Sequence, residues 1–357
     1  MEEKGYETMR EEKLYFASDY QEGMADEILV RLQETNRTPT AGYGQDPYSE
    51  SARTRIREAI GIPEAEIYFL SGGTQTNATV IDGLLRGYEG VIAADTGHIA
   101  MHEAGAIEFG GHKVLTVAGE NGKIRADILA AWLKAFYQDG NHDHMVFPGM
   151  VYISQPTEYG TLYSLGELTE LRGICDTYGL KLYVDGARLA YALASEENTV
   201  SLADLGRLCD VFYIGGTKCG AVIGEALVIA KPQLIPHFFT VIKQHGALLA
   251  KGRLAGVSFD TLFDGGLYER LGRRALRMAD TLRKALVDQG WRFLFETSTN
   301  QIFLIIENGK YEKLQEDVVC SYWEPFDEKH TVIRLATSWA TGEREIEQLI
   351  QIMKRLS

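Results

Sequence analysis

One lysine of the chain lies in a glycine-rich turn. Lys218 belongs to the segment Tyr213-Ile214-Gly215-Gly216-Thr217-Lys218-Cys219-Gly220, directly after an apolar stretch that is typical of a β-strand. Glycines on both sides allow a ligand to approach closely. A lysine that is desolvated near other cations has a lowered pKa and is a better nucleophile toward an aldehyde. Because most lysines are solvated surface groups, Lys218 alone stays ambiguous.

An aspartate precedes this lysine by 33 positions. Asp185 follows the apolar run Leu182-Tyr183-Val184, and Arg188 comes three residues later. Open α/β sheets bind their ligands at the carboxyl ends of their strands. An acid at such a place can keep a pyridine nitrogen protonated, and Arg188 can reach a phenolate oxygen of the same ligand. For this pair alone, a helix-capping aspartate beside a surface arginine is an equally simple interpretation.

A third segment is suited to an anion. Ser71-Gly72-Gly73-Thr74-Gln75-Thr76-Asn77 ends a predicted strand and begins a predicted helix, where free N–H groups point at a ligand. The spacing matches neither the GxGxxG nor the GxxxxGK[ST] pattern, and an ordinary helix cap would explain the loop alone. Together, an amine, a carboxylate and an anion-binding loop are the three parts of a pyridoxal phosphate (PLP) site. Lys218 would form the Schiff base and Asp185 would hold the pyridinium nitrogen.

Two groups of histidines permit a different chemistry. His98 and His102 are spaced i and i+4, which on a helix lets both bind one metal ion, with Glu103 adjacent. The zincin pattern requires a glutamate directly after the first histidine, and it is absent here. We therefore favour a His98 ring stacked on the cofactor. The run Asn141-His142-Asp143-His144 is better explained as a polar loop than as a metal cluster, so we expect no metal site.

The pattern of elements predicts one large α/β sheet. Seven short β-rich runs alternate with stretches of helical spacing, and several runs are apolar throughout, as in strands covered on both faces. The predicted strands are residues 67–71, 90–95, 112–117, 150–155, 181–185, 211–215 and 225–230. The predicted helices among them are residues 77–86, 126–136 and 165–178.

After about Ser258 the order of elements changes. A long helix (267–286) precedes strands at 291–295, 301–307 and 331–336 and a terminal helix, which predicts a smaller α+β domain. We expect an N-terminal segment (1–25) that packs with the small domain, a large PLP-binding domain (26–257) and a small C-terminal domain (258–357).

Composition limits the classes of partner. With 45% apolar and 24% charged residues, the 357-residue chain is typical of a globular protein with a large core. A formal charge of −14 argues against nucleic acid. No run approaches the ~20 apolar residues that span a bilayer, and Met1–Tyr6 contains no signal-peptide core. Four widely separated cysteines without a CxxC pair favour a reduced, cytoplasmic protein.

These motifs occur in the order seen in one known family. The chain resembles the low-specificity threonine aldolases, PLP enzymes of the β-eliminating-lyase group with the fold-type I architecture. The match runs from Ser18-Asp19 to Arg334-Leu335-Ala336-Thr337-Ser338-Trp339. It is carried by Tyr43-Gly44-Gln45-Asp46-Pro47, Gly72-Gly73-Thr74-Gln75-Thr76-Asn77, Gly97-His98-Ile99 with Glu103, Asp185-Gly186-Ala187-Arg188-Leu189, and Thr217-Lys218.

The resemblance implies a role for each matching residue and a homodimer or homotetramer with shared active sites. The implied roles are the Schiff-base lysine for Lys218, the pyridinium partner for Asp185, the cofactor-hydroxyl side for Arg188, the phosphate loop for Gly73 and Thr74, the stacking imidazole for His98, and the grip on the substrate carboxylate for Ser18 and Arg334.

The chain departs from the family at three places. The stretch Ile242-Lys243-Gln244-His245-Gly246 stands where the family has an Arg-Gln pair that reaches the phosphate of a neighbouring subunit, so Lys243 is expected to supply that charge. Gln155-Pro156-Thr157 replaces the usual Glu-Asn-Thr. The further histidine of proton transfer has its approximate counterpart in His144 or His142.

The sequence therefore predicts retro-aldol cleavage of a β-hydroxy-α-amino acid to glycine and an aldehyde. One alternative is another PLP reaction, either β-elimination or transamination. From other classes come a metal-dependent hydrolase that uses His98, His102 and Glu103, and a non-catalytic binding protein on the same fold.

Overall fold

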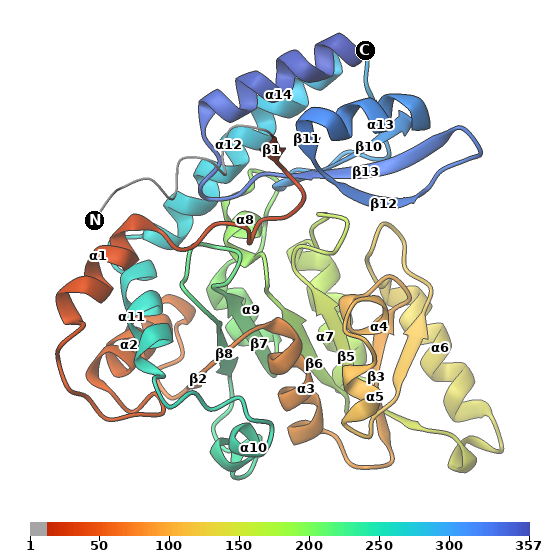
Figure 1. Ribbon diagram of the computed structural model, residues 1–357. Helices are drawn as coiled ribbons and strands as arrows, with labels where there is room; N and C mark the ends of the chain where they lie inside the picture. Colours follow the sequence, from red (N-terminus) through yellow and green to blue (C-terminus); the bar gives the residue numbers. More distant parts are fainter. Residues whose placement is uncertain (1–12) are drawn as a thin grey trace.

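A mixed seven-stranded sheet forms the centre of the molecule. The computed structural model describes residues 13–357, and its large sheet has the strand order β2-β8-β7-β6-β5-β3-β4 (Figure 1). β8 runs antiparallel to both of its neighbours, and the other neighbouring pairs are parallel. The strands are β2 (Glu66–Leu70), β3 (Glu89–Ala94), β4 (Val114–Val117), β5 (Phe147–Ser154), β6 (Lys181–Asp185), β7 (Val211–Gly215) and β8 (Glu225–Ile229). All seven predicted strands are confirmed.

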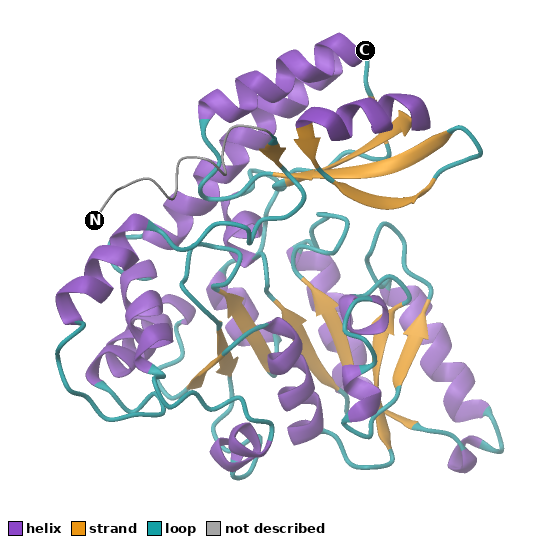
Figure 2. Cartoon of the chain, viewed as in Figure 1, coloured by secondary structure: helices purple, strands orange, loops and turns teal. Residues whose placement is uncertain are grey.

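Helices cover both faces of this sheet (Figure 2). Val151 and Val184 point to one face and pack with Leu168 and Leu171. Tyr152 of β5 points to the other face, together with Tyr183 on the adjacent strand. The alternation follows from the two-residue period of a strand. The helices of the large unit are α1 (Asp26–Thr35), α2 (Pro47–Ile60), α3 (Gly73–Leu84), α4 (His98–Met101), α5 (Ala106–Phe109), α6 (Ala126–Gln138), α7 (Leu165–Tyr178), α8 (Leu189–Ala194), α9 (Leu202–Leu208), α10 (Phe238–Gln244) and α11 (Arg253–Leu262).

A smaller α+β unit lies above the large sheet (Figure 1). Its four antiparallel strands have the order β12-β13-β10-β9, and three helices pack on one face, where Leu304 and Ile333 meet Leu282 and Leu349. β12 and α13 were not predicted. The elements are α12 (Leu267–Asp288), β9 (Arg292–Phe293), β10 (Gln301–Glu307), α13 (Asn308–Asp317), β12 (Ser321–Pro325), β13 (His330–Ala336) and α14 (Glu343–Leu356).

The first described residues belong to the small unit. β1 (Leu14–Tyr15) pairs in parallel with β11 (Val318–Val319), and Phe16 is buried in the core of the small unit. Residues 1–12 of the expected N-terminal segment lie outside the described residues.

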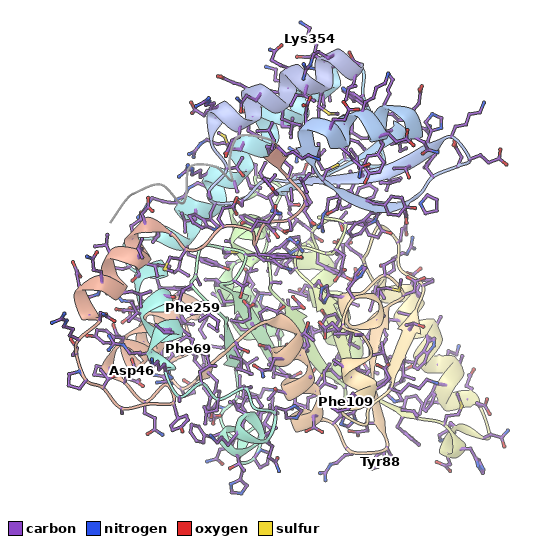
Figure 3. All side chains as sticks on the ribbon, in the orientation of Figure 1. Asp46, Phe69, Tyr88, Phe109, Phe259 and Lys354 are labelled. Carbon is purple, nitrogen blue, oxygen red and sulfur yellow. The ribbon has the colours of Figure 1, made fainter. Side chains whose placement is uncertain are left out.

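The division expected at residue 258 falls inside α11. There Phe259 stacks on Phe69 of β2, with ring centroids 5.3 Å apart (Figure 3). α12 contributes Leu271 to the large core and Leu282 to the small core. We propose that the two units divide along α12.

The loops after β6 and β7 touch at two glycines. A Cβ atom on Gly186 would lie 2.0 Å from the carbonyl oxygen of Tyr213, and one on Gly215 would lie 2.2 Å from that of Ala187. Both distances are too short for any side chain. This close approach brings the end of β6, with Asp185, against the turn that carries Lys218.

The contact at Gly186 predicts a large loss of stability on substitution. Gly186→Ala forces a methyl group against a backbone oxygen, and we expect a loss of about 3 kcal/mol or more. Gly173→Ala is the control, because Gly173 lies in α7 with no atom within 4 Å of an added Cβ. There alanine should stabilise by about 0.5–1 kcal/mol. Urea unfolding of both variants measures the difference, and equal midpoints would contradict the close approach.

Candidate active site

The carboxylate of Asp185 is the most heavily hydrogen-bonded group of the site. Its Oδ2 accepts from Asn77 Nδ2 (3.1 Å) and from the Tyr152 hydroxyl (2.6 Å). Its Oδ1 accepts from the backbone N–H of Ala187 (3.0 Å) and from the Tyr213 hydroxyl. An ionised carboxylate has about four acceptor sites, so these donors occupy them. The two hydroxyl groups can rotate, which lets a ligand N–H take the place of one of them.

The surroundings keep Asp185 ionised. Burial raises the pKa of Asp185, but the positive charge of His98 and the hydrogen bonds of the two tyrosines lower it more, and the net pKa lies below the ordinary value. A permanently ionised acid at the end of β6 is what a protonated pyridine nitrogen requires.

Lys218 is half-buried in the turn after β7. Burial lowers the pKa of its amine, and the Arg188 guanidinium lowers it further. The Lys218 amine lies 5.8 Å from the centre of the Tyr20 ring. A lysine with a lowered pKa is unprotonated more often, so it is a better nucleophile toward an aldehyde.

Glu225 is a second buried acid beside this turn, and no motif marked it as a residue of the site. It lies at the start of β8, and its Oε2 accepts a hydrogen bond from the backbone N–H of Gly216 (2.8 Å). Burial raises the pKa of Glu225 to about 7, although the Gly216 N–H and the Lys218 charge favour the ionised form.

The start of α3 can receive an anion. Gly72 is the N-cap residue and supplies no side-chain cap, and the first intrahelical bond runs from the Thr76 N–H to the Gly72 carbonyl (2.9 Å). The N–H groups of Gly73, Thr74 and Gln75 precede that bond and have no helical acceptor. Such a helix start binds phosphate. Gly73 and Thr74, the residues predicted to bind phosphate, are the first two residues of this helix.

His98 is held by a buried glutamate. It opens α4, and its Nδ1 lies 2.8 Å from Glu103 Oε1, which also accepts from Asn77 Nδ2 (2.7 Å). Asn77 therefore links Glu103 to Asp185 through its two amide hydrogens.

His102 does not join His98 around a common point. The His102 ring is exposed, and its centre lies 5.8 Å from that of His98 and 6.2 Å from the Trp323 ring. Within residues 13–357, no three His, Cys, Asp or Glu side chains gather to hold a metal ion. The donor set that the metal-dependent alternative needs is not assembled there.

Arg188 pairs with an acid that the sequence did not identify as a site residue. Its Nε and Nη2 donate to the two carboxylate oxygens of Asp19 at 2.7 and 3.0 Å. Burial raises the pKa of Asp19, but the charges of Arg188 and Lys218 and the hydrogen bonds from Arg188 and Asn300 together outweigh it, and the pKa falls to about 2. Asn300 donates to the same carboxylate (2.9 Å). Nη1 of Arg188 makes no hydrogen bond to Asp19, and the contact of Arg188 with the cofactor hydroxyl stays a prediction.

Arg334 projects from β13 toward the site and has no acidic partner within residues 13–357. Its Nη1 donates to Gln301 Oε1 (3.1 Å), and its Nη2 donates to the Ala17 carbonyl (2.9 Å) and to Ser321 Oγ (3.2 Å). Its Nε is buried without a partner among these residues. Burial lowers the pKa of Arg334 to about 10, and the Arg188 charge adds to the effect. Ser18, the predicted second grip, follows Ala17 but makes no hydrogen bond to Arg334.

Two predicted residues lie away from this cluster. His144 precedes β5, whereas the site lies at the other end of that strand, where Ser154 pairs with Asp185. Eight residues of strand separate the two ends by roughly 25 Å. His142 lies at the same end as His144, because its ring packs against Phe147, the first residue of β5. The structure therefore corrects the predicted catalytic role of these histidines within one subunit.

Lys243 lies on the surface near the phosphate loop. Its amine is exposed and lies 4.7 Å from the centre of the Tyr43 ring. The neighbouring His245 carbonyl accepts a hydrogen bond from Gln75 of the loop (3.4 Å). Lys243 does not reach the Asp185 cluster of its own chain.

Fold and site together define a class of protein. An aspartate aminotransferase from Thermus thermophilus has a TM-score of 0.70 over 97% of this chain and 92% of that chain, at 14% identity, which shows a common fold alone. The model of the beta-eliminating lyases matches residues 16–308. The architecture is thus that of the fold-type I PLP enzymes.

Two more similar proteins narrow the class. A low-specificity L-threonine aldolase from a Pseudomonas species is 30% identical over 350 residues, which is 96% of this chain and 97% of that protein. The structure of a threonine aldolase from Leishmania major is 42% identical, has a TM-score of 0.92 and covers 96% of this chain and 99% of that one. The chain belongs to the beta-eliminating lyase family and, within it, to the low-specificity threonine aldolases.

The raised pKa of Glu225 predicts how stability depends on pH. The folded protein holds this proton up to about pH 7, whereas an ordinary glutamate loses it near 4.5. Folding stability attributable to Glu225 is therefore present below pH 4.5 and is lost as the pH rises through 7. Glu225→Gln keeps an acceptor for the Gly216 N–H and has no proton to lose.

Between pH 4 and pH 8, the free energy of unfolding of Glu225→Gln should rise by roughly 3 kcal/mol relative to that of the parent protein, by the conversion of a pKa shift to free energy. Urea unfolding of both proteins across this range gives the difference. A gap that stays constant from pH 5 to pH 8 would contradict the assignment.

Proposed function

We propose that the protein is a PLP-dependent aldolase that cleaves β-hydroxy-α-amino acids of the L-threonine type to glycine and an aldehyde. Support comes from the names of its relatives, from the amine with a lowered pKa at Lys218, and from the ionised acid at Asp185. The observation that carries the choice of substrate is Arg334, a half-buried arginine whose buried Nε has no hydrogen-bond partner and whose guanidinium has no acidic partner within residues 13–357.

The residues of the site fit the cofactor. Lys218 would hold its aldehyde carbon, Asp185 its ring nitrogen, the N–H groups of Gly73 and Thr74 its phosphate, and the His98 imidazole one face of its ring. Pyridoxal phosphate, when bound, stabilises the electron pair left on an amino-acid Cα when one of the bonds to that carbon breaks.

Arg334 would choose which bond breaks by fixing the substrate carboxylate. A buried cation is costly unless it meets an anion, and a carboxylate beside Nε would supply both the missing charge and the missing acceptor. With the carboxylate fixed at β13 and the amine beside Lys218, the two remaining bonds of Cα, to hydrogen and to Cβ, would project to opposite faces of the cofactor ring, which lets the Cα–Cβ bond stand upright over it. Positioning of this kind selects the reaction, since the cofactor alone permits several.

We propose further that two copies share their active sites. Lys243 and Tyr43 lie exposed together beside the phosphate loop, where a charge from one copy would reach the phosphate of the other. The partner is a second copy of this chain, and the substrate is a small amino acid.

Within residues 13–357, no helix is both long and apolar enough to cross a membrane. We propose a cytoplasmic location, because all four cysteines are free thiols, as expected in a reducing compartment.

Chemical labelling tests the role of Lys218. Borohydride reduction of the holoenzyme, followed by peptide mapping, should place the pyridoxyl group on Lys218, because this amine is the one with the lowered pKa beside Asp185. Lys218→Arg should abolish the label, and Lys231→Arg, at an exposed lysine, should leave it unchanged. A label on another lysine would overturn the assignment.

Kinetics test the role of Arg334. A charge-assisted hydrogen-bonded pair is worth roughly 1.5–3 kcal/mol, so Arg334→Ala should raise KM for L-threonine by about one to two orders of magnitude. Arg334→Lys keeps the charge but loses the planar, two-pronged geometry of the guanidinium, so its KM should lie between those of the parent and of Arg334→Ala. Arg292→Ala, at an exposed arginine of the same sheet, is the control. A KM within twofold of the parent in Arg334→Ala would assign the carboxylate to another group.

A further inference from the structure

Glu158 is a buried acid that lies between the cofactor residues and the substrate arginine. It lies in the loop after β5, and its side chain faces the amino end of α4, where Oε1 accepts a hydrogen bond from the backbone N–H of His98 (3.0 Å). The same oxygen accepts from Ser154 Oγ (2.7 Å). Ser154 is the strand neighbour of Asp185. The loop therefore holds a carboxyl group over the carboxyl end of the sheet.

The other side of this loop touches the group that would bind the substrate carboxylate. The Glu158 backbone carbonyl accepts from Gln301 Nε2 (3.4 Å), and Gln301 Oε1 accepts from Arg334. One side chain thus separates Glu158 from the guanidinium. A substrate held between Lys218 and Arg334 would have its β-carbon in the space that Glu158 borders.

The two oxygens of Glu158 are not equivalent. Oε1 takes both hydrogen bonds, whereas Oε2 has no hydrogen-bond partner within residues 13–357 and, unlike Glu103 Oε2, is not closed off from solvent. An oxygen in this position can accept a proton from a ligand without breaking an existing contact.

Charges on every side of Glu158 affect its proton. Burial raises the pKa of Glu158 above the ordinary value; the hydrogen bond from Ser154 and the charge of His98 oppose this rise, and the charge of Asp185 adds to it. A base whose pKa lies closer to neutrality is more effective near neutral pH. The other titratable or charged groups that face it are Tyr152, Tyr159, Tyr163 and Arg188.

We propose that Glu158 is the general base of the cleavage, taking the β-hydroxyl proton through Oε2; this inference rests on the proposed function. As the O–H bond breaks, its electron pair forms the second C–O bond of the aldehyde, and the Cα–Cβ bond breaks. The pair from that bond stays on Cα, which then gains a proton and becomes the glycine methylene. Glu158 gives the proton it took to water, and Cα gains one proton by a route that does not use Glu158, so the protons balance over the reaction.

The two histidines nearby are less suited to this step. His98 has Nδ1 bound to Glu103, and the proposed stacking directs the face of its ring, not a nitrogen, at the ligand. The His102 ring is exposed beside the rings of His98 and Trp323, and it makes no hydrogen bond to another side chain within residues 13–357.

Glu158→Gln tests the proposal with little change in shape. The amide oxygen can still accept from Ser154 and from the His98 N–H, but the group no longer takes a proton. In the holoenzyme we expect kcat for L-threonine cleavage to fall at least 100-fold, in the range of general-base catalysis. Exchange of the glycine α-proton with deuterated water, which needs Lys218 but no β-hydroxyl, should stay within threefold. Glu324→Gln removes a charge from neighbouring β12 and should leave both reactions within twofold.

The pH profile provides the second readout. The acid limb of kcat/KM for L-threonine, set by Glu158 above the ordinary glutamate pKa, should disappear in Glu158→Gln. Cleavage within threefold of the parent, or an equal fall in cleavage and glycine exchange, would overturn the proposal.

Two further comparisons keep the test decisive. A parent holoenzyme that neither cleaves L-threonine nor exchanges glycine would instead refute the proposed function itself. If Glu158→Gln fails to bind cofactor, the pH profiles of the parent enzyme for the two reactions are compared instead. An acid limb in the profile of cleavage but not in that of glycine exchange supports the role of Glu158. The same acid limb in both profiles overturns it.

Discussion

The site depends on keeping one buried carboxylate ionised. Without its donors, burial would protonate Asp185, and a neutral acid could not hold a positively charged ring nitrogen. The donors come from separate elements: Asn77 from α3, Tyr152 from β5 and Tyr213 from β7. Each of these elements must therefore hold its donor at a fixed position relative to the carboxyl end of β6. The arrangement of the sheet around Asp185 is thus a requirement of its charge.

Close packing at glycines satisfies that requirement on one side. Because the loops after β6 and β7 touch at Gly186 and Gly215, the turn of Lys218 cannot move away from Asp185. The loop after β6 also carries Arg188, which pairs with Asp19 in the N-terminal segment and lowers the pKa of Lys218. One backbone contact therefore sets both the position of the nucleophile and its readiness to react.

Periodicity and motifs were enough to predict the large sheet and the residues with a chemical signature. All seven strands were predicted, and so were the positions of Lys218, Asp185 and the loop at Gly73, because glycines and apolar runs mark them. The partners were not predictable in this way. Tyr152 and Tyr213 look like ordinary core residues in apolar strands, and only strand register turns them toward one carboxylate. His144 was assigned from the family resemblance alone, although its place before β5 puts it at the amino end of that strand and the site lies at the carboxyl end.

The small unit contributes more than a lid of apolar surface. Gln301 begins β10 opposite Ala336 of β13, and its amide joins Arg334 to the loop of Glu158. The same residue thus contacts the group proposed to hold the carboxylate and the segment that carries the proposed base. Ser154 and the His98 N–H hold Glu158 to the large unit, whereas Arg334 belongs to the small sheet, so Gln301 is the contact that sets the position of one relative to the other. If Arg334 and Glu158 have the proposed roles, recognition of the carboxylate and removal of the β-hydroxyl proton both depend on this contact, and a ligand without the carboxylate would not be held with its β-hydroxyl at Glu158.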